Sequence, residues 1–170
     1  TYTGATPLAL QKFQGEQVSI LDLFIGAKVG FSTGAPAMFI LLCGLYLAFR
    51  GMLDWRIPAS ILTSAALFSG IFYLVDPAVY PHPLFVLFSG GLMLGAWFMA
   101  TDMVGSPVTL LGTIVFGALI GIITVVIRLF GGMAEGVMYA ILLGNAASPL
   151  IEHFTQPRTF GKKSEKKKAG

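Results

Sequence analysis

Long apolar stretches alternate along this chain with short polar or glycine-rich segments. A membrane-spanning helix needs about 20 mostly apolar residues, within a range of about 17–25. The shorter run Val18–Gly30 contains Asp22 and Lys28, so it predicts an interfacial or half-length helix rather than a span. Five stretches are long enough and have no charge at their centres, and we predict that each is a transmembrane helix: Gly34–Arg50, Ile57–Val75, Leu84–Ala100, Val108–Phe130 and Met133–Ile151.

The composition supports an all-α integral membrane protein. Hydrophobic residues make up 55% of the chain, charged residues 11%, and the mean hydropathy is +0.80. A soluble helical bundle is excluded because these segments lack the polar face that such helices show to water. We therefore divide the chain into an extracytoplasmic segment (1–33), a five-helix membrane domain (34–151) and a basic cytoplasmic tail (152–170).

The distribution of positive charge predicts the orientation. If the five spans alternate in direction, Arg50 and Arg56 lie on the side of the carboxyl tail, which gives that side 8 Lys and Arg residues against 3 on the other. Positive residues collect on the cytoplasmic side of membrane proteins. The tail is thus predicted to be cytoplasmic and the amino-terminal segment to lie outside. We interpret the tail as a solvated topology signal that can touch anionic lipid, and we expect no nucleic-acid binding.

The segment predicted to lie outside contains Thr3-Gly4-Ala5-Thr6, which fits the [S/T]-G-A-T acceptor sequence of periplasmic flavin transferases. In such a sequence the last threonine, here Thr6, is esterified by the phosphate of FMN. This bond leaves the flavin ring unchanged, so the protein environment tunes the redox potential. The alternative to flavin attachment is that Thr6 is an unmodified threonine in a turn before Pro7. The motif is short, and its predicted extracytoplasmic position is the independent argument for modification.

A few polar residues near the span ends are candidates for a second site. Thr101 and Asp102 lie in the predicted cytoplasmic turn between the third and fourth spans. Carboxylates at a membrane edge are usually paired or functional. Asn145 lies within the fifth span and Glu152 at its cytoplasmic end. We consider these four residues for cation entry or contact with a second flavin, although helix–helix hydrogen bonding also explains an amide such as Asn145.

Metal and haem sites are not expected. The single Cys43 excludes disulfides and cysteine-ligated iron–sulfur clusters within this chain. His82 lies between two prolines and is more typical of a turn than of a ligand. Glycines spaced by four or five residues in the fourth span predict close helix packing. Four aromatic residues are candidates for stacking on a flavin, with lipid contact or gap filling as the alternative: Phe68, Phe72, Trp97 and Phe98.

Several sequence strings, in order along nearly the whole chain, resemble the D subunit of the Rnf ferredoxin:NAD oxidoreductase complex; the B subunit of the sodium-translocating NADH:quinone reductase is similar. The strings are Trp55-Arg56-Ile57-Pro58, His82-Pro83-Leu84-Phe85, Phe98-Met99-Ala100-Thr101-Asp102, Ser106-Pro107, Ile127-Arg128 and Glu135-Gly136-Val137 with the later Asn145.

The resemblance implies a ten-span subunit of two inverted five-helix repeats, related in fold to urea transporters, with this chain as the second repeat. It implies covalent FMN on Thr6 and a non-covalent riboflavin in the complete subunit. The implied partners are a flavin-bearing G-type subunit and small membrane subunits of a bacterial or archaeal inner-membrane complex. One position departs from the family pattern, because Ala35 replaces a glutamate that relatives commonly carry.

The function expected from these features is electron transfer coupled to Na⁺ or H⁺ translocation, by a subunit that is not catalytic alone. In this scheme Asp102 and Glu152 are the candidates for cation entry. The alternatives are a urea-channel-like solute transporter without a redox role and an unmodified structural anchor, because fold does not fix function. The flavin acceptor motif separates these possibilities, since a solute channel has no need of it.

Overall fold

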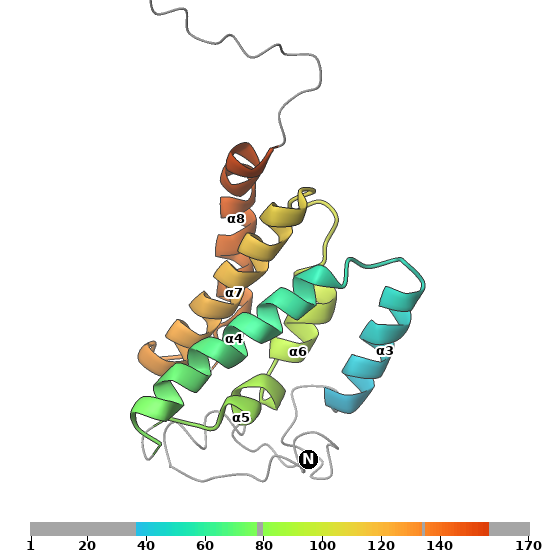
Figure 1. Ribbon diagram of the computed structural model, residues 1–170. Helices are drawn as coiled ribbons and strands as arrows, with labels where there is room; N and C mark the ends of the chain where they lie inside the picture. The colour runs from blue at the N-terminus through green and yellow to red at the C-terminus, as the bar shows by residue number, and fades with distance from the viewer. Residues whose placement is uncertain (1–36, 78–79, 134, 157–170) are drawn as a thin grey trace, which may run out of the picture.

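The computed structural model describes residues 37–77, 80–133 and 135–156, and every regular element in these ranges is a helix. This confirms the predicted all-α class for the described part of the chain (Figure 1). The predicted segments Val18–Gly30 and 157–170, like the flavin motif, lie outside the described residues. The elements are α3 (Ala37–Phe49), α4 (Arg56–Val75), α5 (Pro83–Phe88), α6 (Leu92–Leu94), the π-helix η1 (Gly95–Met99), α7 (Leu110–Phe130) and α8 (Val137–Thr155).

Helices α4 and α7 match the second and fourth predicted spans almost residue for residue. Among the described helices, these two are long and apolar enough to cross a membrane. At 1.5 Å per residue, the 21 residues of α7 extend about 31 Å, close to the thickness of a hydrocarbon core.

Helix α8 begins and ends four residues later than the predicted fifth span. Its 19 residues are long enough to cross a bilayer, but it carries polar residues in its second half. Pro149 lies inside this helix and has no N–H to donate to the carbonyl of Asn145. The later boundary puts Glu152 within α8 rather than after it.

The prediction of one continuous helix over Leu84–Ala100 is wrong. Helix α5 ends at Phe88, Ser89 is extended, and Gly90 has φ +69°, a left-handed conformation that only glycine adopts without strain. The chain becomes helical again at Leu92 and passes into the π-helix. A Ser-Gly-Gly sequence therefore divides the segment into two short helical pieces.

Helix α3 is described over 13 residues, which extend about 20 Å, and it ends one residue before the predicted span does. Residues 34–36 of that span lie outside the described ranges. The full five-helix, urea-transporter-like arrangement therefore stays a prediction.

Small residues bring α4 and α7 into direct contact. A Cβ atom built on Gly117 would overlap Ser60 Oγ, and one built on Gly121 would overlap Ser64 Oγ. Both serine hydroxyls donate to carbonyls of their own helix, so they are satisfied inside this contact. The predicted glycine-mediated packing is confirmed here. The core between the helices is completed by large apolar side chains such as Phe116 and Ile120, each with no exposed surface.

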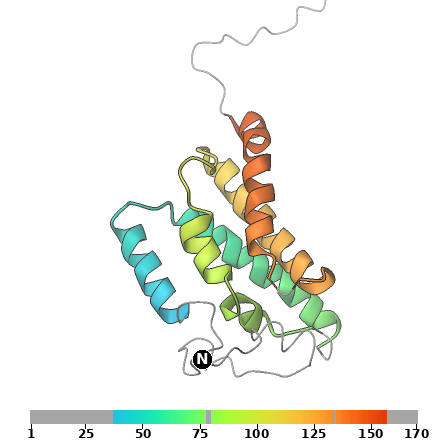
Figure 2. The same ribbon diagram turned by 180° about the vertical axis from the view of Figure 1, so that it is seen from behind.

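Two connections and the last turn of α8 gather at one end of the helices, which we call the tail end. The connections are residues 50–55 and residues 100–109. Residues 51–57 share a cavity lining with residues of the 101–107 loop, and the start of α7 is hydrogen bonded to the end of α8. Both ribbon views show this grouping, with α5 and the start of α8 at the opposite end (Figures 1 and 2). The described segments therefore alternate in direction, which is the condition that the charge argument assumed.

We predict that Gly121→Ala lowers the stability of the subunit by about 1–3 kcal/mol, the usual cost of overpacking. The added Cβ would lie 2.7 Å from Ile61 O, a backbone atom that cannot rotate away. Thermal unfolding of the detergent-solubilised subunit measures the effect. Gly132→Ala is the matched control, because nothing lies within 4 Å of its Cβ position. Equal stability of the two variants would contradict the close contact.

Candidate functional site

The loop after the π-helix carries Thr101 and Asp102 at the tail end. The Thr101 hydroxyl donates to Trp97 O at 2.8 Å, which ties the loop to the π-helix. Asp102 is exposed; its Oδ1 accepts the N–H of Val104 at 3.4 Å, and its carbonyl accepts the N–H of Ser106 at 3.1 Å. The aspartate therefore shapes the turn while its carboxylate stays accessible from the tail end.

Helix α8 packs its polar residues against this same loop. Glu152 is half-buried, and its Oε1 accepts the N–H of Val108 at 3.3 Å. One turn further on, the hydroxyls of Thr155 and Thr109 are 2.6 Å apart. Asn145 is also half-buried, and its amide atoms lie 3.0–3.1 Å from where a Cβ on Gly105 would stand. The structure thus brings Asn145 and Glu152 to the loop of Thr101 and Asp102.

This cluster is not a preformed metal centre. Among the described residues, no group of three or more His, Cys, Asp and Glu side chains could hold a metal ion. Glu152 has a structural partner in the Val108 N–H. A role in cation entry for Asp102 and Glu152 stays a prediction. Thr3, Gly4, Ala5 and Thr6 lie outside the described residues, so covalent FMN also stays a prediction.

His82 is a turn residue, as its sequence context indicates. Its Nδ1 accepts the N–H of Leu84 at 3.3 Å and so caps the start of α5. Its ring packs edge-on against Tyr73, with the centroids 5.2 Å apart. The histidine thus fixes where the broken third segment begins.

Arg128 is a residue whose role the sequence did not reveal. The charge count places it among the positive residues of the outer side, but its side chain is only 5% exposed and turns into the protein. Nη1 donates to Val86 O at 2.5 Å and Nη2 to Ser89 O at 3.2 Å. These carbonyls lie at the C-terminal end of α5, where a helix carries partial negative charge. Glu135 adds a favourable electrostatic interaction.

A sequence signal for this contact does exist in retrospect. An arginine in the last turn of an apolar helix needs a buried acceptor or access to water. A Ser-Gly-Gly interruption in a neighbouring apolar segment supplies carbonyl acceptors. The two features together indicate a guanidinium that caps a broken helix. Neither feature is specific alone.

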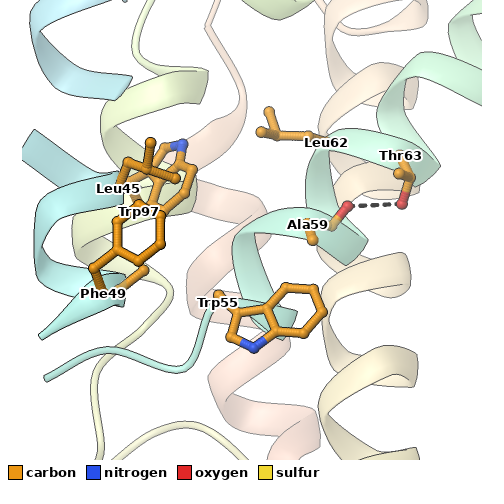
Figure 3. Close-up of a pocket in the computed structure, with 8 residues that line it drawn as sticks. Leu45, Phe49, Trp55, Ala59, Leu62, Thr63 and Trp97 are labelled. Carbon is orange, nitrogen blue, oxygen red and sulfur yellow. Dashed lines mark hydrogen bonds between the residues drawn. The ribbon is translucent and has the colours of Figure 1, made fainter. Parts of the chain in front are cut away.

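An apolar cleft of about 710 Å³ separates α3 from α4. Figure 3 shows Leu45, Phe49 and Trp97 along one side and Trp55, Ala59, Leu62 and Thr63 along the other. Of the four aromatic residues considered for stacking on a flavin, Trp97 alone is in this lining. Phe68 and Phe72 instead contact each other edge-on, with the ring centroids 5.2 Å apart.

The chain matches the model of the NQR2, RnfD, RnfE family over residues 1–161. It belongs to that family. Its relatives include the D subunit of the Na(+)-translocating ferredoxin:NAD(+) oxidoreductase complex of Acetobacterium woodii, which is 46% identical over 99% of this chain. Two further D subunits each match over 94% of the chain. One is 39% identical and belongs to the ion-translocating oxidoreductase complex of Sodalis glossinidius. The other is 38% identical and belongs to the proton-translocating ferredoxin:NAD(+) oxidoreductase complex of Clostridium ljungdahlii.

The chain spans about half the length of these family members: 52%, 53% and 51% respectively. The match confirms the resemblance seen in the sequence strings. Together with the apolar helices, it identifies the chain as part of a multi-pass bacterial membrane protein. The names of the relatives assign sodium to one and protons to another. Membership of the family therefore does not fix the cation.

We predict that Arg128→Met destabilises the subunit by about 1.5–3 kcal/mol, the worth of hydrogen bonds to a charged group. The variant leaves the Val86 and Ser89 carbonyls without their donor. The stability of Arg128→Lys should lie between that of the wild type and that of Arg128→Met. A single ammonium group cannot reproduce the planar arrangement of donors in a guanidinium. The measurement is thermal unfolding of the purified subunit. Arg50→Met, at an exposed arginine, should change stability by less than about 0.5 kcal/mol. A loss as small as that of the control would refute the capping role.

Proposed function

We propose that this chain is part of the membrane subunit of an ion-translocating electron transport complex. The observation that carries the proposal is the family match over residues 1–161, which includes the flavin acceptor motif. In this proposal the Thr6 hydroxyl holds FMN through a phosphoester. When bound, FMN would supply a carrier for one or two electrons. The partners would be a flavin-bearing G-type subunit, small membrane subunits and, during maturation, a flavin transferase.

The coupling to cation movement has a simple electrostatic basis. Adding an electron to a group in a low-dielectric site costs free energy unless a cation accompanies it. Asp102 and Glu152 would receive Na⁺ or H⁺ at the tail end, where both meet the 100–109 loop. Asp102 is exposed and Glu152 half-buried, which suits successive contacts along an entry path. Thr101 and Asn145 would contribute uncharged oxygen atoms beside them.

The orientation belongs to the proposal as well. The tail end carries Arg50 and Arg56, and α8, which precedes the basic segment in the sequence, ends there. The positive-inside rule makes this end cytoplasmic and Thr6 extracytoplasmic. A riboflavin in the complete subunit would be a second carrier. Family membership favours this redox function over a solute channel.

We predict that Thr6→Val abolishes the covalent flavin while the subunit still assembles. The full-length subunit is expressed with a flavin transferase, denatured, and analysed by intact mass and in-gel flavin fluorescence. The variant should lack the mass of one esterified FMN and should not fluoresce. Thr1→Val, outside the motif, is the control and should stay modified. Flavin retained on the denatured Thr6 variant would contradict the assignment.

We predict that Asp102→Asn and Glu152→Gln lower ion-gradient formation by about tenfold or more, since a contact to a charged group is worth about 1.5–3 kcal/mol. Both changes are isosteric. An amide oxygen still accepts from the N–H of Val104 or Val108, so the loop keeps its shape and only the charge is lost. Gradient formation is measured in vesicles that contain the complex. Glu165→Gln in the tail is the control, and gradients equal to wild type would exclude these carboxylates.

A further inference from the structure

The apolar cleft between α3 and α4 borders a smaller, polar cavity. The second cavity has a volume of about 410 Å³, and Trp55 lines both. Among the described residues, no charged side chain lines the apolar cleft, whereas Asp54, Arg56, Thr101 and Ser106 line the polar cavity. Both lie toward the tail end, beside the connection of α3 to α4. A ligand that fills both must be apolar along most of its length and polar at one end.

Trp97 forms part of the wall of the apolar cleft. The residue is 8% exposed, and its Nε1 is buried inside the protein. The indole is held firmly, because a Cβ on Gly44 would lie 2.5 Å from Trp97 Cε3. The ligand therefore meets a fixed apolar ring surface at this side of the cleft.

We propose that the cleft and the polar cavity together bind one phospholipid. An acyl chain lies between α3 and α4, against the Trp97 indole. The phosphate pairs with Arg56, because a guanidinium matches a phosphate with two parallel hydrogen bonds. Tryptophan is favoured where the hydrocarbon meets the headgroups, which fits Trp55 at the junction of the two cavities. The position at the predicted cytoplasmic edge suits a lipid of the inner leaflet.

The charges of the polar cavity select the headgroup. Asp54 and Arg56 are opposite charges in one cavity, and Asp54 Oδ1 is occupied by the backbone N–H of Arg56 at 3.3 Å. A headgroup with a phosphate and a primary ammonium complements both charges, and this describes phosphatidylethanolamine. Phosphatidylcholine has no N–H to donate to Asp54, and phosphatidylglycerol has no positive charge.

The bound lipid would have a structural purpose. Helix α3 contacts α6 and the π-helix but is separated from α4 by the cleft. A lipid chain in the apolar cleft would contact both α3 and α4, and so link α3 to the packed α4–α7 pair. The proposal requires only that the chain lies in a membrane. It does not depend on FMN, so a Thr6 variant should bind the lipid as the wild type does.

The first test is a lipid titration by native mass spectrometry. The purified complex is stripped of lipid in detergent and titrated with phosphatidylethanolamine, phosphatidylcholine or phosphatidylglycerol. We expect one molecule of phosphatidylethanolamine to bind at least about fivefold more tightly than the other two. Asp54→Asn and Arg56→Gln should each weaken that binding by a similar factor. Arg50→Gln should not, because Arg50 lines neither cavity.

The second test locates the lipid. Phosphatidylethanolamine with a photoreactive diazirine on its acyl chain is crosslinked to the complex, and the labelled peptides are identified. We expect labelling at residues 45–49 and 55–63, and its loss in Ala59→Trp, which fills the cleft. The matched control is Leu67→Trp, at a residue that is 71% exposed and outside the lining.

Three outcomes would overturn the proposal. Equal binding of all three lipids, unchanged in the variants, would mean that only annular lipid contacts this face. Labelling elsewhere but not at residues 45–63 would mean that another helix of the complex covers the cleft. Release of a flavin or quinone on Ala59→Trp would identify a ring compound as the occupant.

Discussion

The contact of Arg128 with the carbonyl end of α5 is the interaction on which the arrangement of the helices depends. A chain that breaks its helix inside an apolar environment exposes backbone oxygens that must be satisfied within the protein. Arg128 supplies two donors from the last turn of α7 to Val86 and Ser89. One side chain thereby satisfies the end of α5 and ties the third segment to α7. The interruption at Ser89, Gly90 and Gly91 is possible because that guanidinium is available.

The packing divides the described residues into a tight part and a loose part. Helices α4 and α7 approach so closely at Gly117 and Gly121 that there is no room for a methyl group. In a membrane such contacts gain from dispersion and close approach, since lipid already solvates apolar surface. Helix α3 has no comparable partner in α4, and the apolar cleft lies between them. The closely packed pair α4–α7 and the separate helix α3 therefore face each other across a cleft that Trp97 helps to line.

Within the described residues, the polar side chains considered for cation entry gather at the tail end. Asp102, Asn145 and Glu152 come from a loop and a helix that are more than 40 residues apart, as the bond from Val108 to Glu152 shows. The same end carries the polar cavity with Asp54 and Arg56. The proposed coupling of redox chemistry to cation movement would need such a polar entry from one aqueous side. The relatives of the chain include one named for sodium translocation and one named for proton translocation.

The sequence by itself determined the helical class, the second and fourth long apolar helices and the family. These follow from apolar segment length and from ordered motifs, which act locally or along one helix. The tertiary structure decided that Leu84–Ala100 is broken, that Arg128 turns inward and that Trp97 rather than Phe68 or Phe72 lines the cleft. Hydropathy averages over a segment and so misses a single glycine at φ +69°. Side-chain direction also depends on which helix lies opposite, which periodicity cannot specify in helices that are apolar on all sides.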